Sequence, residues 1–173
     1  PIVFSKAIDK KIFSPDAHIE IPRRLELGNT IITDPKIYEK LTPKEIVAYS
    51  SQVGASKIAL KLGYEELKNN YYSFGFTKPI SINFPSAAFG LMNAKETVSD
   101  RELASLGYGY GLKVSPFQLT AAYSTFANNG IRKEFKLLMN DEVTSKRVIS
   151  ESSARHTLEA LQKVVKIGTG KKA

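Results

Sequence analysis

The stretch from Thr42 to Leu62, TPKEIVAYSSQVGASKIALKL, constrains the fold of this chain more than any other. It opens on a helix start, because Thr42 can cap, Pro43 suits the first helical position and Glu45 can close a capping box. Apolar residues at helical spacing then supply a buried face, and they are Ile46, Val47, Ile58, Ala59 and Leu62. The stretch is therefore predicted to be mostly helical and mostly core.

Small polar residues interrupt the middle of this stretch, at Ser50-Ser51-Gln52-Val53-Gly54. On an unbroken helix Ser50 and Gln52 would point in different directions, since residues two apart do not share a face. If the chain leaves the helix here, the hydroxyl and the amide can face one side and one cleft. Two interpretations stay open on local grounds. One is a broken helix that presents a site, and the other is one long helix in which Ser50 and Gly54 allow close packing.

A second distinctive string is GYGYGLKVSPFQLTAAYSTFANNG, at Gly107–Gly130. Its alternate glycines predict core packing or a chain reversal. A nucleotide loop is rejected, because the string has no Lys-Ser/Thr ending and no preceding strand. Ser115, Pro116 and Gln118 then repeat the cap, proline and capping-box pattern of a helix start. The buried face of that helix is predicted to be Leu119, Ala122, Tyr123 and Phe126.

Other segments follow the same pattern rules. Further helices are predicted at 1–13, 64–74, 99–105 and 150–166, the last with Leu158, Leu161, Val164 and Val165 inward. Residues 25–27 and 31–32 are expected to pair weakly as strands. A loop or edge strand is expected at 77–90, and one or two strands around 135–139 and 143–149.

Composition narrows the possible chemistry. A chain of 173 residues can form one domain with a real core. It has no cysteine, which excludes disulfides and thiolate nucleophiles, and its two histidines, His18 and His156, lie far apart without a ligand set. We therefore predict no metal and no cofactor. The net charge of +8 is spread in separate basic pairs, which favours a solvated surface; a nucleic-acid binder is suggested by charge alone.

Two strings together resemble the transpeptidase domain of class B penicillin-binding proteins, most closely the septal, cell-division type. They are SSQVGASKIAL at Ser50–Leu60 and GYGLKVSPFQLTAAYSTFANNG at Gly109–Gly130. The second motif of this family, Ser-x-Asn, lies in a loop between two helices; Ser50 falls on its serine and Gln52 on its asparagine. The resemblance implies the α/β fold shared with serine β-lactamases, here mainly its helical lobe with a few short strands.

The same resemblance implies that two motifs of the family lie outside this sequence. No Ser-x-x-Lys occurs in the chain, and Lys166-Ile167-Gly168 only imitates the Lys-Ser/Thr-Gly motif, because isoleucine takes the hydroxyl position. The Gly168-Thr169-Gly170 string looks like the link that precedes that third motif. We therefore expect residues 1–173 to be the central part of one transpeptidase domain, with the nucleophile motif before Pro1 and the third motif after Ala173.

The function that the resemblance implies is a serine-type peptidoglycan D,D-transpeptidase, which cross-links stem peptides during septal cell-wall synthesis and is acylated by β-lactams. Ser50 would relay a proton, Gln52 would present its amide to substrate although it is one methylene longer than asparagine, and Ser51 would point away. This chain alone would be inactive. The alternative is a non-catalytic, penicillin-binding-like module that makes protein contacts in a division complex.

Partners and location are likewise expectations from the resemblance. The expected partners are peptidoglycan stem peptides, β-lactams and other division proteins, with no nucleic acid. No apolar run in the chain approaches the length of a membrane span. Contact with the membrane is expected only through an anchor outside this sequence, at the periplasmic face of the inner membrane.

Overall fold

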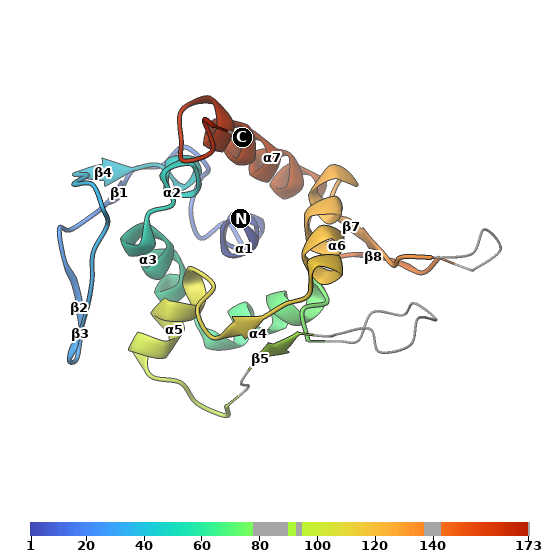
Figure 1. Ribbon diagram of the computed structural model, residues 1–173, viewed down its shortest axis with the longest axis horizontal. Helices are drawn as coiled ribbons and strands as arrows, with labels where there is room; N and C mark the ends of the chain where they lie inside the picture. The colour runs from blue at the N-terminus through green and yellow to red at the C-terminus, as the bar shows by residue number, and fades with distance from the viewer. Residues whose placement is uncertain (78–89, 93–94, 137–142, 173) are drawn as a thin grey trace.

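A short apolar helix, α1 (Ile2–Asp9), lies in the middle of the other helices in the computed structural model (Figure 1). The structure describes residues 1–77, 90–92, 95–136 and 143–172. Four helices contact α1: α2 (Pro43–Tyr49), α3 (Gln52–Leu62), α4 (Tyr64–Ser73) and α7 (Glu151–Lys166). The main core includes three residues of α1, which are apolar and lie at helical spacing: Ile2, Val3 and Ala7.

Two more helices, α5 (Asp100–Gly107) and α6 (Pro116–Ala127), complete the helical arrangement. Phe74 at the end of α4 packs against Phe126 of α6, with ring centroids 5.4 Å apart, and both side chains are fully buried. On the other side, α3 packs along α5. The core therefore reaches into every helix, which makes the described residues one helical unit.

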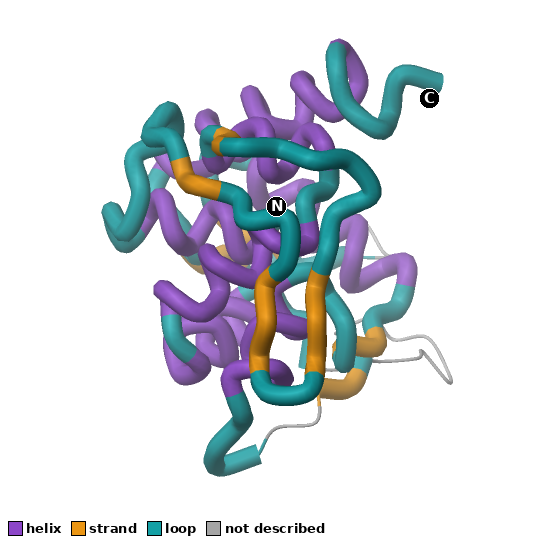
Figure 2. The backbone as a smooth tube through the Cα atoms, turned by 90° about the vertical axis from the view of Figure 1, so that its left-hand side faces the viewer, coloured by secondary structure: helices purple, strands orange, loops and turns teal. Residues whose placement is uncertain are grey.

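Strands are short and form four antiparallel pairs among the described residues. The pairs are β1 (Ile19–Glu20) with β4 (Lys40–Leu41), β2 (Leu25–Leu27) with β3 (Thr30–Ile32), β5 (Leu91–Met92) with β6 (Leu112–Lys113), and β7 (Ile131–Lys133) with β8 (Ser145–Arg147). Figure 2 shows the β2–β3 hairpin in front of the helices, on the side that faces the viewer. The predicted balance of helices and short strands is confirmed.

The predicted helix starts are confirmed in detail. Thr42 with Glu45, Ser99 with Glu102 and Ser115 with Gln118 each form a complete capping box. Gln118 is buried and also donates its amide to the carbonyls of Gly75 and Phe76. The residue that closes the cap of α6 therefore also ties α6 to the end of α4.

The alternate glycines that begin at Gly107 serve both of the uses predicted for them, which are close packing and a chain reversal. A Cβ built at Gly107 would lie 2.7 Å from the carbonyl oxygen of Ala55 and 2.7 Å from Ala59 Cβ, so this glycine lets α5 approach α3. Gly109 and Gly111 have φ angles of +91° and +85°, which reverse the chain towards β6.

Several predicted boundaries and faces are wrong. The first helix ends at Asp9 instead of Phe13, because Lys11 takes a left-handed conformation and the chain turns back. In α7 the fully buried positions are small residues; of the predicted inward residues, Leu158 and Leu161 pack half-buried against the core, whereas Val165 is 51% exposed. Small residues occupy the buried positions because they allow α7 to approach α1 and α2 closely. One of them, Ser153, also donates its hydroxyl to the Ser5 carbonyl.

Of the strands expected towards the C-terminal end, the first begins earlier than predicted, and the second, β8, is shorter than residues 143–149. Pairing starts at Ile131, in β7, and returns in β8. Residues 137–139 of the first expected strand lie outside the described residues, as do residues 78–89 of the predicted loop or edge strand.

Candidate active-site wall

The helical stretch that was predicted from Thr42 onward is broken at its polar centre. α2 ends at Tyr49 and α3 begins at Gln52, so Ser50 and Ser51 form the link between them. The single-helix interpretation is therefore wrong. We call Ser50, Ser51 and Gln52 the Ser50 loop.

Ser50 ends α2 in a left-handed conformation, with φ 57° and ψ 41°. Its N–H donates to the carbonyls of Ile46 and Val47, and the Ser51 N–H donates to the Ile46 carbonyl at 3.0 Å. This hydrogen-bond pattern usually has glycine at the left-handed position. A serine there costs roughly 1–2 kcal/mol, which the surrounding structure must offset. Strain of this kind often marks a functional position.

Ser51 opens α3 as its N-cap. Its Oγ accepts from the Gly54 N–H at 2.9 Å and donates to Asp34 Oδ2 at 2.5 Å. The side chain is almost fully buried, at 2% exposure. Its hydroxyl is therefore held by Asp34 and Gly54, and Ser51 also lines the cavity that Ser50 and Gln52 line.

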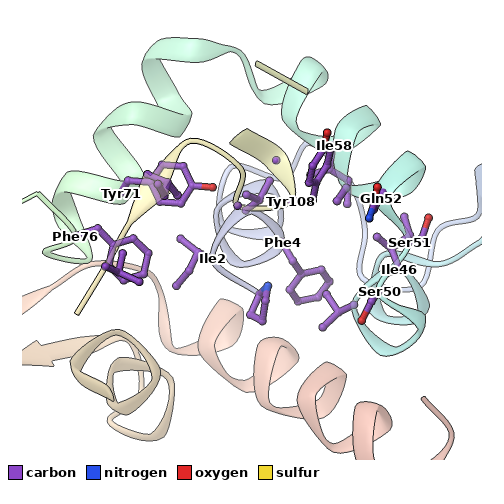
Figure 3. Close-up of a pocket in the computed structure, with 18 of the residues that line it drawn as sticks. Ile2, Phe4, Ile46, Ser50, Ser51, Gln52, Ile58, Tyr71, Phe76 and Tyr108 are labelled. Atoms are coloured by element: carbon purple, nitrogen blue, oxygen red, sulfur yellow. The ribbon is translucent and has the colours of Figure 1, made fainter. Parts of the chain in front are cut away.

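Ser50 and Gln52 are both exposed and line the same cavity, of about 490 Å³ (Figure 3). Apolar and aromatic side chains make much of its remaining wall, among them Phe4, Ile46, Tyr71 and Tyr108. The break between α2 and α3 therefore brings the two predicted site residues to one opening. A hydroxyl and an amide beside an apolar wall can orient a peptide-like ligand by hydrogen bonds.

The ionisable side chains that line this cavity within the described residues are all tyrosines. Tyr71 donates its hydroxyl to the Leu106 carbonyl at 2.6 Å, and burial raises its pKa. Burial also raises the pKa of Tyr123. Both phenols therefore stay protonated at neutral pH, so neither supplies a general base there.

Two residues of the predicted α6 face, Leu119 and Tyr123, also line the cavity. They are 44% and 39% exposed, so the prediction that they are fully inward is wrong. Their helical periodicity is correct, but their side of α6 faces an opening. A periodic pattern reports which residues share a face and does not report whether another element covers that face.

The Gly168-Thr169-Gly170 string lies against the end of α2. The Thr169 N–H donates to the Ala48 carbonyl at 3.1 Å, and Thr169 Oγ1 lies 3.2 Å from Ser50 Oγ. A Cβ at Gly168 would lie 2.0 Å from the Ala48 oxygen, so glycine is required for this approach. The sequence indicates a glycine-rich link here but offers no signal for a contact between residues so far apart in the chain.

Lys57 and His156 do not line this cavity. Lys57 Nζ donates to the Glu20 carbonyl at 2.7 Å, and His156 Nδ1 lies 3.3 Å from Glu159 Oε2. The described part of the chain holds no group of three or more acidic or histidine side chains placed to hold a metal ion. No helix in that part is long and apolar enough to cross a membrane.

A buried amine fixes α2 to α7. Lys44 is 8% exposed, and its Nζ lies 3.1 Å from Asp16 Oδ1 and 2.7 Å from Glu159 Oε2. The hydrogen bond from Lys44 lowers the pKa of Glu159; burial opposes this shift, and His156 reinforces it. The ion pair orients α2, the helix that directly precedes Ser50.

We expect Glu159→Gln to destabilise the chain near neutral pH and to have little effect in acid. Because the folded pKa of Glu159 lies below its unfolded value, its contribution is present above about pH 4.5 and is lost as the pH falls through the folded pKa. Glu159 is partly exposed, so screening limits the expected loss to about 1 kcal/mol.

Urea unfolding at about pH 7 and about pH 3 measures this difference. The matched control is Glu96→Gln, which removes an exposed carboxylate that has no ion pair among the described residues. Equal destabilisation by Glu159→Gln at both pH values would contradict the assignment.

The helical fold and the position of the Ser50 loop agree with a sequence match along the whole chain. Residues 1–173 match the family described as the penicillin binding protein transpeptidase domain, and the chain belongs to this family.

Individual relatives agree with this membership. The chain is 31% identical over 172 residues to the peptidoglycan D,D-transpeptidase FtsI of Escherichia coli K12, covering 98% of this chain and 29% of that protein. It is 30% identical over 171 residues to FtsI of Buchnera aphidicola from Schizaphis graminum, covering 98% of this chain and 30% of the relative. The chain therefore spans less than a third of the length of these relatives.

Solved structures give the same result. The apo transpeptidase domain of Burkholderia pseudomallei penicillin-binding protein 3 superposes with a TM-score of 0.89 at 32% identity, over 95% of this chain and 51% of that one. A putative peptidoglycan glycosyltransferase from Atopobium parvulum superposes with a TM-score of 0.91 at 26% identity, over 98% of this chain and 42% of the other. The penicillin-binding-protein fold predicted from the two strings is confirmed.

Proposed function

We propose that these residues form the central part of one domain of a serine-type peptidoglycan D,D-transpeptidase that works in septal cell-wall synthesis and is acylated by β-lactams. The observation that carries the proposal is the Ser50 loop, which presents a hydroxyl and an amide at one cavity in a chain of this family. The names of the FtsI relatives support the same reaction. The comparisons do not favour the non-catalytic alternative.

In this proposal the nucleophile comes from outside the sequence. The chain contains no Ser-x-x-Lys, and no lysine or carboxylate is among the described residues that line the cavity. A nucleophile motif before Pro1 and a Lys-Ser/Thr-Gly motif after Ala173 would complete the site. The incoming serine hydroxyl would lose its proton to the motif lysine and attack the D-Ala-D-Ala carbonyl.

The two residues of this wall would then act on the reacting peptide. Ser50 would pass the proton to the amine of the departing D-alanine as the acyl-enzyme forms. Gln52, the first residue of α3, would donate its amide to the stem peptide or β-lactam. An amine of a neighbouring stem peptide would resolve the acyl-enzyme and form the cross-link.

The proposal extends to partners and location. Stem peptides and β-lactams are the proposed ligands, and other division proteins are the proposed partners. The proposed location is the periplasmic face of the inner membrane, held by an anchor outside this sequence. Family membership and the names of the relatives support a bacterial cell-envelope protein.

Labelling with a fluorescent penicillin tests the function. We expect the full-length polypeptide to be labelled covalently, this chain alone to remain unlabelled, and Gln52→Ala in the full-length polypeptide to be labelled more slowly. Preincubation with unlabelled penicillin is the control for specific acylation. Covalent labelling of the isolated chain, or no labelling of the folded full-length polypeptide, would contradict the proposal.

A further inference from the structure

Asp34 lies in the connection between β3 and β4, far from the Ser50 loop in sequence, and it binds that loop through three hydrogen bonds. Its Oδ2 accepts from the Ser51 hydroxyl at 2.5 Å. Its Oδ1 accepts from the Gln52 N–H at 2.6 Å and from the Val53 N–H at 3.1 Å. The sequence pattern indicates only a turn at Asp34-Pro35.

These bonds complete the hydrogen bonding at the start of α3. The first turn of a helix leaves N–H groups without intrahelical acceptors. Here Asp34 takes those of Gln52 and Val53, Ser51 takes that of Gly54, and the Ala55 N–H already reaches the Ser51 carbonyl at 3.0 Å. A carboxylate is also favoured at a helix N-terminus by the helix dipole.

The connection between β3 and β4 also contacts the end of α2, on the other side of the break from α3. Tyr38 stacks on Tyr49, the last residue of α2, with ring centroids 5.4 Å apart and planes inclined by 12°. The connection between β3 and β4 therefore contacts both the end of α2 and the start of α3. It bridges the point where one continuous helix would otherwise form.

We propose that Asp34 is a positioning residue, which keeps α2 and α3 separate so that Ser50 and Gln52 face the cavity together. The inference deepens the proposed function and rests on it. Asp34 does not touch the cavity and acts through Ser51 and the Gln52 amide. Its hydrogen bonds favour the start of α3 at Gln52, which offsets the left-handed conformation that Ser50 must adopt.

Removing the carboxylate should loosen the loop without unfolding the chain. Gln52 is exposed, so water can replace Asp34 at its N–H, and Ser51 can still cap Gly54. For Asp34→Ala in the full-length polypeptide we expect the rate constant of acylation by a fluorescent penicillin to fall by about 10- to 100-fold, because small misplacement of a reacting group has effects of this size. Asp34→Asn keeps one oxygen for the two N–H groups and should be intermediate.

Two readouts separate positioning from folding. Loss of folded protein lowers the amplitude of labelling, whereas misplacement of Ser50 lowers the rate constant of the folded fraction. Hydrogen exchange in the same polypeptide should be faster at the amides of Gln52 and Val53 in Asp34→Ala. The matched control is Glu39→Ala, which removes a carboxylate of the same connection that has no hydrogen bond or ion pair among the described residues.

Unchanged exchange at these two amides, or an unchanged acylation rate constant, would overturn the inference. An effect of Glu39→Ala as large as that of Asp34→Ala would also overturn it. If the unsubstituted polypeptide is not acylated at all, the proposed function has failed, and the exchange comparison alone decides whether Asp34 holds the Ser50 loop. If Asp34→Ala does not fold, the acylation rate constant and the hydrogen exchange of Asp34→Asn decide whether Asp34 positions the Ser50 loop.

Discussion

Removal of the Ser50 hydroxyl is expected to lower the acylation rate constant of the full-length polypeptide by about 100-fold or more, a size typical of the loss of a proton-transfer group. Ser50→Ala and Ser50→Gly both remove the hydroxyl that lines the cavity. Fluorescent penicillin labelling measures the rate. Ser73→Ala, which removes an exposed hydroxyl bonded to the Asn69 carbonyl of its own helix, is the control.

The two Ser50 variants are expected to differ in stability, which separates the effect on chemistry from the effect on folding. Ser50 has φ 57°, where glycine is free of the strain that a Cβ introduces. Ser50→Gly should therefore be more stable than Ser50→Ala by about 1 kcal/mol in urea unfolding, although both lose activity. Wild-type acylation of either variant would contradict the role of Ser50, and the reverse order of stability would contradict the left-handed geometry.

Gly107→Ala is expected to destabilise the chain by about 3 kcal/mol, the upper part of the range for overpacking. The new Cβ would lie 2.7 Å from the carbonyl oxygen of Ala55, and because this oxygen belongs to the backbone of α3, no side chain can move aside. The two helices would have to separate. Alanine is the better helix former by about 1 kcal/mol, so a net loss identifies packing as the cause.

Gly109→Ala is the matched control for the Gly107 variant. A Cβ there has no neighbour within 4 Å, but the φ of +91° is strained for alanine. We expect a loss of about 1 kcal/mol, from conformation alone. Urea unfolding of both variants measures the difference, and a Gly107→Ala protein as stable as wild type would contradict the close approach of α5 to α3.

Local sequence rules predict the helix starts well. Thr42, Ser99 and Ser115 each stand three residues before a glutamate or glutamine, and each forms the expected capping box. These motifs are predictable because every partner lies within one turn of the chain. The pairing of β2 with β3 is predictable for the same reason, since a Gly-Asn turn joins two short apolar segments.

The break at the Ser50 loop is a feature that local sequence rules do not predict. The sequence of α2 and α3 is compatible with one continuous helix as well as with a break, because apolar residues continue at helical spacing on both sides. The hydrogen bonds around the break come from α2, from the Ser51 cap of α3 and from Asp34. The bonds of α2 and the Ser51 cap join near neighbours and can be sought in the local pattern, whereas those of Asp34 cannot. The family resemblance favours the break because it brings in information from other chains.

By itself the sequence determined the helix caps, the glycine turns, the absence of cysteine chemistry and the pair of strings that indicate the family. Tertiary structure alone decided that Ser50 and Gln52 share a cavity, that Thr169 lies beside Ser50, and that Asp34 binds the start of α3. The physical reason is separation along the chain. Caps and turns are made by neighbours, whereas these contacts join residues whose distance is set by how the helices pack around α1.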